Sequence, residues 1–124
     1  MNNTILLIED KPSLSDALKS LLELHQYTVA TATNGEEGIR AARKLRPDLV
    51  ISDIYMPVLN GLDLLDNFRD DPALQDIPVV MLTARSEIDD IQQALERGAA
   101  GYVTKPFLFK NLHAVIRGIF EKQL

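Results

Sequence analysis

The segment Ile5-Leu6-Leu7-Ile8-Glu9-Asp10 joins four consecutive apolar residues to two carboxylates. A strand with one wet face alternates apolar and polar residues, whereas an unbroken apolar run is typical of a strand covered on both faces. Two further segments, Leu49-Val50-Ile51 and Val79-Val80-Met81-Leu82, have the same unbroken character. These three segments predict the central strands of a parallel sheet.

Helix-length amphipathic stretches separate apolar runs along the whole chain. Ser13 followed by Asp16, and Asn34 followed by Glu37, are typical start signals for the first two helices. Three more helices are expected over residues 61–70, from Ser86 to Gly98, and over 109–120. The predicted strands cover residues 5–8, 27–30, 49–51, 77–82 and 99–103. This alternation predicts an α/β fold, a doubly wound five-stranded parallel sheet, as one domain over residues 1–124.

The composition narrows the class of protein. The chain has 124 residues, of which 46% are hydrophobic and 25% charged, which suits a folded domain rather than a disordered segment. A net charge of −5 argues against a nucleic-acid partner, and the lack of cysteine excludes disulfides and zinc–thiolate sites. The first residues lack the pattern of a signal peptide, and no apolar run has the ~20 residues of a membrane span. We therefore expect a cytoplasmic protein without a membrane partner.

Polar and charged residues stand at the carboxyl ends of the predicted strands. Glu9 and Asp10 follow the first strand, Asp53 the third, Thr83 the fourth and Lys105 the fifth. Ligands of open parallel sheets bind beyond these strand ends, and the first and third strands of such a sheet are neighbours. We therefore expect three carboxylates to converge on one cavity, beside a hydroxyl and an ammonium group.

Three adjacent carboxylates are unfavourable without a cation, because like charges repel. Oxygen ligands that leave positions open to water and phosphate suit Mg²⁺, which would also clamp a transferring phosphoryl group. Lys105 would add a compact positive charge on the other side of the cavity. Asp53 could then attack phosphorus and form an acyl phosphate, with catalysis resting on positioning and charge neutralisation.

Each of these residues alone has an ordinary structural explanation. An Asp after a buried strand is usually a loop or cap residue, and Thr83 is a typical hydroxyl at a helix start. A lysine at position 105 is commonly a surface residue. The coincidence of these residue types at the same end of successive strands is what favours a phosphoryl-transfer site.

Four motifs at these strand ends resemble the receiver domains of two-component response regulators, most closely the stand-alone, chemotaxis-regulator-like members. The resemblance covers essentially the whole chain and implies a flavodoxin-like sheet of strand order 2-1-3-4-5. The motifs are Ile8-Glu9-Asp10, Ser52-Asp53-Ile54-Tyr55-Met56-Pro57 with Asn60-Gly61, Leu82-Thr83-Ala84, and Gly101-Tyr102-Val103-Thr104-Lys105-Pro106-Phe107.

The resemblance implies a metal and phosphoryl site with defined roles. Asp53 would be the phosphoacceptor, with Thr83 and Lys105 contacting the phosphoryl group. Asp10, Asp53 and the backbone carbonyl of Tyr55 would hold Mg²⁺, while Glu9 would act through water.

The resemblance also implies a switch. Thr83 would move toward the phosphoryl oxygen, and Tyr102 would change its rotamer as Thr83 moves. This change would reshape the surface of the fourth helix, fifth strand and fifth helix, and a partner that prefers that surface would shift the population. The bond between Lys105 and Pro106 is expected to be cis, which would aim Lys105 inward.

Two positions are expected to tune dephosphorylation. Tyr55 and Arg85 lie two residues after Asp53 and Thr83, at positions that flank the path of hydrolytic water in this family. A bulky ring and a long cation there could shield the phosphoryl group. We therefore predict slower autodephosphorylation than in a variant with Asn at 55 and Glu at 85.

Three other readings compete with a phosphorylatable switch. An aspartyl-phosphate phosphatase usually carries a second Asp where this chain has Tyr55, and its cap region needs a longer chain. A flavin- or nucleotide-binding module would offer Gly, Ser or Thr after the first strand, where this chain has Glu9-Asp10. A pseudo-receiver that is never phosphorylated is disfavoured, because every key residue is present.

The resemblance implies partners rather than a turnover enzyme. A histidine kinase or histidine phosphotransfer protein would donate the phosphoryl group, and the chain would catalyse only its own phosphorylation and dephosphorylation. If the chain is complete, its output would be a protein–protein contact. We expect a monomer and leave open a dimer formed through the last two helices after phosphorylation. His25 and His113 lie on predicted helices and are expected to be surface residues.

Overall fold

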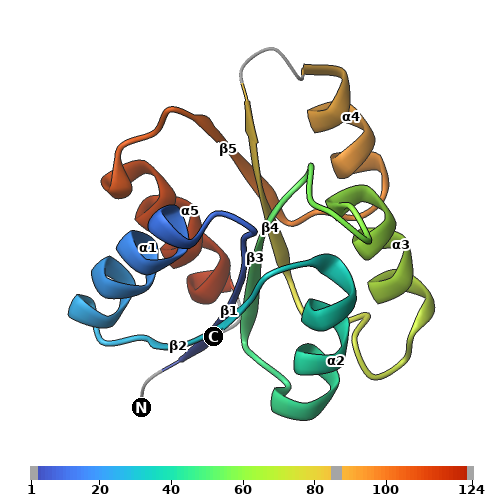
Figure 1. Cartoon of the computed structure of the whole chain (residues 1–124), viewed down its shortest axis with the longest axis horizontal. Helices are drawn as coiled ribbons and strands as arrows, with labels where there is room; N and C mark the ends of the chain where they lie inside the picture. Colours follow the sequence, from blue (N-terminus) through green and yellow to red (C-terminus); the bar gives the residue numbers. More distant parts are fainter. Residues whose placement is uncertain (1–2, 85–87, 123–124) are drawn as a thin grey trace.

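Five parallel strands form one sheet in the computed structural model, which describes residues 3–84 and 88–122. The strand order is β2-β1-β3-β4-β5, which confirms the predicted doubly wound α/β fold (Figure 1). The strand bounds are Thr4–Ile8 for β1, Thr28–Ala32 for β2, Leu49–Asp53 for β3, Val79–Ala84 for β4 and Gly101–Lys105 for β5.

Helices cover both faces of the sheet, as right-handed crossovers between parallel strands require. One face carries α1 and α5, and the opposite face carries α2, α3 and α4 (Figure 1). The helix bounds are Pro12–Leu24 for α1, Gly35–Leu45 for α2, Gly61–Asp70 for α3, Ile88–Glu96 for α4 and Phe109–Lys122 for α5. None of the helices within residues 3–84 and 88–122 is long and apolar enough to cross a membrane.

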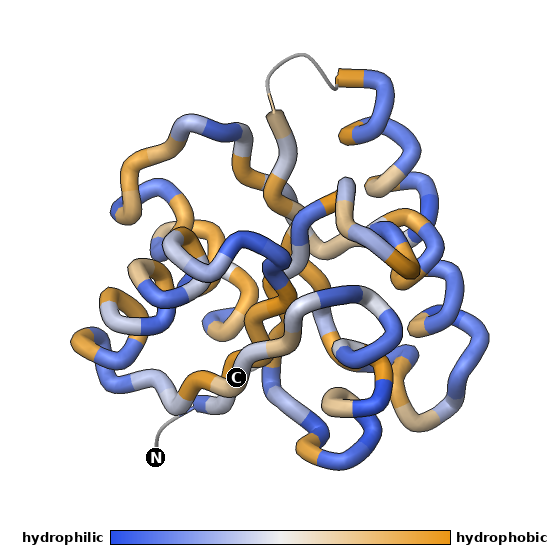
Figure 2. Tube along the Cα trace, viewed as in Figure 1, coloured by the Kyte–Doolittle hydropathy of each residue, from blue (hydrophilic) through white to orange (hydrophobic). Residues whose placement is uncertain are grey.

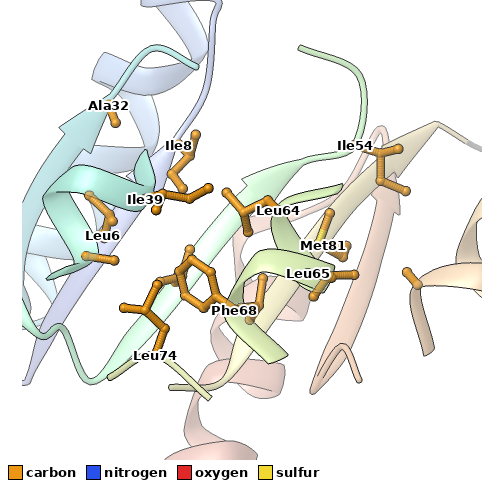
Figure 3. Packing of buried hydrophobic residues seen from close by; sticks show 14 residues of the cluster. Leu6, Ile8, Ala32, Ile39, Ile54, Leu64, Leu65, Phe68, Leu74 and Met81 are labelled. Carbon is orange, nitrogen blue, oxygen red and sulfur yellow. The ribbon is translucent and has the colours of Figure 1, made fainter. Parts of the chain in front are cut away.

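Two hydrophobic clusters hold the layers together, one on each face of the sheet. Alternate residues of β1 supply both clusters, since Leu6 and Ile8 face α2 and α3 while Ile5 and Leu7 face α1 and α5. Figure 2 shows this division, with apolar residues concentrated along the strands and polar residues on the outer helix surfaces. In Figure 3, Leu64, Leu65 and Phe68 of α3 lie over the sheet beside Leu74 and Met81. The strands are therefore fixed from both sides, which makes their carboxyl ends a rigid platform.

The observed start of α2 agrees with the start predicted from the sequence, whereas the observed start of α1 differs from the predicted one. The Asn34 side chain accepts a hydrogen bond from the Glu37 N–H, so the predicted cap of α2 is confirmed. The prediction that Ser13 begins α1 is wrong, because the helix already begins at Pro12. Proline suits the first helical position, since its fixed φ matches the helix and its missing N–H needs no partner. The predicted start of α4 at Ser86 lies outside the described residues.

The pairing register aligns the ends of the three central strands. Ile8 pairs with Ser52, and Asp53 pairs with Leu82. The residue after β1, Glu9, therefore lies beside the last residue of β3, Asp53. Thr83 pairs with Thr104, which places Lys105 one residue beyond Thr83 on the next strand.

Candidate functional site

Three carboxylates from two neighbouring strands meet at the carboxyl edge of the sheet. Glu9 and Asp10 follow β1, and Asp53 ends β3. Glu9 is 1% exposed and Asp53 5% exposed, while Asp10 is half-buried. One oxygen from each lies within 4.8 Å of the others, so the expected convergence of these residues is present.

This cluster has the donor chemistry of a divalent cation site. Oε1 of Glu9 and Oδ1 of Asp10 are buried, and neither accepts a hydrogen bond within the part of the chain that the structure describes. Buried carboxylate oxygens without a partner are costly, and a cation bound between them would supply what is missing. Carboxylates in this number fit Mg²⁺ or Ca²⁺ better than a soft transition metal, because no thiolate or imidazole takes part.

Lys105 brings a positive charge to the same cluster. Its Nζ lies 2.6 Å from Oδ1 of Asp53 and 3.7 Å from Oε1 of Glu9. The Lys105–Pro106 peptide bond is cis, which is the form that the resemblance implied. The distance to Asp53 is that of a charge-assisted hydrogen bond in a largely buried setting.

Burial raises the pKa of Glu9 from its usual 4.5 to about 8, and the adjacent Asp53 carboxylate adds to the rise. Two contacts oppose this effect. The Lys11 N–H donates a hydrogen bond to Oε2 of Glu9 at 3.1 Å, and the Lys105 ammonium lies nearby. At neutral pH the protein without a metal therefore favours a proton on Glu9, and that proton relieves part of the repulsion.

Thr83 and Tyr102, the predicted switch pair, lie on adjacent strands. Thr83 is 2% exposed, and Tyr102 is 43% exposed. Tyr102 pairs with Met81, two residues before Thr83, so the side chains of Tyr102 and Thr83 point to the same face of the sheet. This placement is what a mechanical link between them would need, although the link itself stays a prediction.

Tyr55 lies in the loop after β3, and its ring is 61% exposed. Its hydroxyl donates a hydrogen bond to Oδ2 of Asp90 on α4 at 2.6 Å. No pattern in the sequence singled out Asp90, because the contact depends on where α4 packs. Arg85, the second position expected to tune dephosphorylation, lies outside the described residues.

An apolar hollow of about 370 Å³ adjoins the site on the side of α1 and α5. Lys105 forms part of its wall, so the hollow opens beside the side chain that contacts Asp53. The other residues that line it are Leu14, Ala17, Leu18, Leu21, Pro106, Phe107 and Phe109.

Comparisons with known proteins agree on one family. The family model described as response regulator receiver domain matches residues 5–117. Among curated proteins, the DNA-binding response regulator MtrA of Mycolicibacterium smegmatis is 39% identical over 94% of this chain. That match takes in 50% of MtrA, so the chain spans about half the length of such relatives.

Two solved structures show the same architecture. A response regulator receiver domain protein from Clostridium thermocellum superimposes with a TM-score of 0.91 at 29% identity. The match covers 98% of this chain and 96% of that one. The chemotaxis response regulator CheY4 of Vibrio cholerae gives a TM-score of 0.84 at 31% identity, over 93% of this chain and 99% of that one.

Proposed function

The chain belongs to the response regulator receiver domain family, and from that premise we propose that it is a signalling switch phosphorylated on Asp53. The observation that carries the proposal is the site itself: three carboxylates within 4.8 Å of one another, with Lys105 Nζ 2.6 Å from Asp53. A single buried Asp would have an ordinary structural explanation, whereas this combination has the parts that phosphoryl transfer requires.

The proposed chemistry is transfer of a phosphoryl group from a phosphohistidine or a small acyl phosphate. An oxygen of Asp53 forms a bond to phosphorus while the donor's P–N or P–O bond breaks, and the leaving group keeps the electron pair. Lys105 stabilises negative charge on the transferring group, and the Thr83 hydroxyl donates to one of its oxygens. The chain acts on itself and is not a turnover enzyme.

We propose that the metal is Mg²⁺, held by Asp10, Asp53 and the backbone carbonyl of Tyr55, with Glu9 acting through water. When bound, the ion would neutralise the carboxylates and the oxygens of the transferring group. Oε1 of Glu9 and Oδ1 of Asp10, which accept no hydrogen bond within the described residues, support this assignment.

The proposed output surface consists of α4, β5 and α5. Phosphorylation adds charge and strong acceptors at Asp53. Movement of Thr83 toward them would leave room for the Tyr102 ring, which lies on the same sheet face. Large apolar side chains are already exposed on these elements, as a protein-binding surface would need, namely Ile88 and Leu95 of α4 and Tyr102 of β5.

A histidine kinase or histidine phosphotransfer protein is the proposed donor, and a downstream protein is the proposed target. The apolar hollow beside Lys105 supports a protein donor, because it offers a contact surface next to the acceptor. MtrA is a DNA-binding response regulator by name, and this describes that protein as a whole. For this chain the absence of a direct nucleic-acid contact stays a prediction, supported by its net charge of −5.

Intact-mass analysis tests the proposal. The protein is incubated with acetyl phosphate, with and without Mg²⁺, alongside an Asp53→Asn variant. We expect wild type to gain one phosphoryl group only with Mg²⁺, and the variant to gain none. A wild type that gains no phosphoryl group and also fails to bind beryllofluoride would support the pseudo-receiver reading instead.

A further inference from the structure

We propose that Asp90 is a positioning residue for the phosphorylation site, which holds the Tyr55 ring across the approach to Asp53 and thereby prolongs the life of the phosphoryl group. The inference rests on the proposed function, since it concerns the same site. It goes beyond that function because it assigns a role to a residue of α4 that touches neither the carboxylate cluster nor Lys105 in any contact described above.

The contact between Tyr55 and Asp90 is short and directional. The Tyr55 hydroxyl donates to Oδ2 of Asp90 at 2.6 Å, a distance typical of an O–H···O⁻ hydrogen bond, which is stronger than a neutral one. Tyr55 is 61% exposed, so burial in the core does not fix its ring. The directional bond to Asp90 holds the far end of the ring on α4.

The topology places this bond across the mouth of the site. Tyr55 belongs to the loop that leaves β3, two residues after Asp53, whereas Asp90 is the third residue of α4, the helix after β4. β3 and β4 are neighbours, and Asp53 pairs with Leu82, the residue before Thr83. The Tyr55–Asp90 bond therefore joins the segments that follow these two strands beyond their shared carboxyl edge. That edge carries both the proposed acceptor and the hydroxyl proposed to contact the phosphoryl group.

A ring held there would slow hydrolysis of the acyl phosphate. In hydrolysis, a water oxygen forms a bond to phosphorus, and the P–O bond to Asp53 breaks. Inorganic phosphate leaves, the Asp53 carboxylate is regenerated with the electron pair, and a proton from water passes to solvent. The attacking water must line up opposite the Asp53 oxygen, and a ring fixed over the edge reduces the space for that approach. Loss of the bond removes this restraint on the ring, and the path for water widens.

The bond also ties the phosphoryl lifetime to α4. Whatever draws Asp90 away from Tyr55 would shorten the lifetime, because the ring would lose the bond that holds its far end on α4. The same contact thus joins the chemistry of the site to one element of the proposed output surface.

The protein is first phosphorylated with acetyl phosphate and Mg²⁺, and both reagents are then removed. Fresh Mg²⁺ is added in excess, and the half-life of the phosphoryl group on the protein is measured. The variants are Tyr55→Phe, which keeps the ring and loses the hydroxyl, Asp90→Ala, and the two combined. Asp90→Asn keeps an oxygen acceptor without the charge. Asp89→Ala removes an adjacent exposed carboxylate of the same helix turn and serves as the matched control.

We expect Tyr55→Phe and Asp90→Ala each to shorten the half-life by about three- to tenfold, the scale expected when one solvent-exposed hydrogen bond of ordinary strength is lost. The double variant should match the single variants, because both remove the same bond. Asp90→Asn should retain most of the wild-type half-life, and Asp89→Ala should leave it unchanged. Thermal unfolding of each variant identifies any general loss of structure. If Asp90→Ala does not fold, the half-life of Tyr55→Phe is compared with wild type instead.

The inference is overturned if Asp90→Ala keeps the wild-type half-life, if Asp89→Ala shortens it equally, or if the single effects multiply in the double variant. In each of these outcomes the wild type is still phosphorylated, so the proposed function stands. A wild type that takes up no phosphoryl group overturns both the function and the inference.

Discussion

Lys105 Nζ lies 2.6 Å from Oδ1 of Asp53 and 3.7 Å from Oε1 of Glu9, so one ammonium group serves two of the three clustered carboxylates. One positive charge cannot balance three negative ones. Without a metal, part of the remaining imbalance is met by the proton that burial favours on Glu9. The proposed Mg²⁺ would take the place of that proton.

Replacement of Lys105 by Met should destabilise the metal-free protein and slow phosphorylation. The substitution leaves the buried Asp53 carboxylate without its ammonium partner. Loss of one partner of a buried pair costs about 3–5 kcal/mol, and we expect about 1–3 kcal/mol because the Lys105 side chain is 24% exposed. Urea unfolding measures the first effect and the rate of phosphorylation by acetyl phosphate the second. Lys110→Met, at an exposed position of α5, is the control and should change the free energy of unfolding by less than about 0.5 kcal/mol.

Replacement of Asp10 by Asn should stabilise the metal-free protein and remove its response to Mg²⁺. The change removes one of three like charges and gives the site an amide donor, so we expect the free energy of unfolding to rise by about 1 kcal/mol. Wild type should gain stability as Mg²⁺ is added, by linkage, and the variant should not. Asp16→Asn, at an exposed position of α1, should leave both quantities near wild type. If Mg²⁺ stabilised wild type and Asp10→Asn equally, Asp10 would not be a ligand of the metal.

Replacement of Gly61 by Ala should disturb the acceptor through the backbone. A Cβ at this position would lie 2.5 Å from the Asp53 carbonyl oxygen and 2.9 Å from Cα of Ile54, and it would also clash with the end of the Met81 side chain. Backbone atoms must move to relieve such contacts, and we expect a loss of about 2 kcal/mol or more in stability together with slower phosphorylation.

Gly118→Ala provides the comparison for Gly61. It lies in α5, and an added Cβ there meets no atom within 4 Å. Helix propensity then predicts a gain of about 0.5–1 kcal/mol with phosphorylation unchanged. If both alanine variants behaved alike, the close approach of Gly61 to the Asp53 backbone would have no energetic consequence.

His113 should make the protein less stable as the pH falls below about 6.5. Burial lowers its pKa from the usual 6.5, and the positive charges of His25 and Arg117 add to this effect. The unfolded chain therefore takes up the proton at a higher pH than the folded protein. The stabilisation is complete above 6.5 and is lost as the pH falls toward the folded pKa.

A His113→Gln variant isolates this effect in urea unfolding across the pH range. Its free energy of unfolding should fall less steeply than that of wild type as the pH drops below about 6.5. Glu9 contributes with the opposite sign, since its raised pKa makes stability fall as the pH rises toward about 8. That contribution is common to both proteins and cancels in their difference. If the free energy of unfolding depended on pH with the same slope in wild type and variant, His113 would not be a source of the pH dependence.

The fold and the carboxylate cluster could be predicted because each rests on a short-range pattern. Unbroken apolar runs identified the central strands, and parallel pairing then required their carboxyl ends to lie together. Glu9 and Asp53 meet because β1 and β3 are neighbours, and the Lys105 side chain reaches them from the end of β5; the full strand order was implied by the family resemblance. The start of α1 was misjudged because a Ser–Asp spacing was preferred over Pro12, whose ring fits the first turn equally well.

Contacts between side chains of separate helices could not be predicted in the same way. Tyr55 reaches Asp90 across 35 positions of sequence, and only the packing of α4 brings them together. The rings of His25 and His113 lie 4.5 Å apart, and Tyr27 shares a hydrogen bond with His113 at 3.1 Å. His113 is half-buried in this group rather than an exposed surface residue as expected, while His25 is exposed. Such contacts depend on rotamers and on the angle between helices, which apolar periodicity does not encode.

Phosphorylation of Asp53 is tested most directly by locating the modified residue. Borohydride reduces an acyl phosphate to an alcohol, so protein treated with acetyl phosphate and Mg²⁺ and then reduced should carry homoserine at the phosphorylated aspartate. Peptide mapping by mass spectrometry is predicted to find homoserine at position 53, and only in samples that contained both reagents. Homoserine at position 10 or at any other aspartate, with Asp53 unchanged, would rule out Asp53 as the phosphoacceptor.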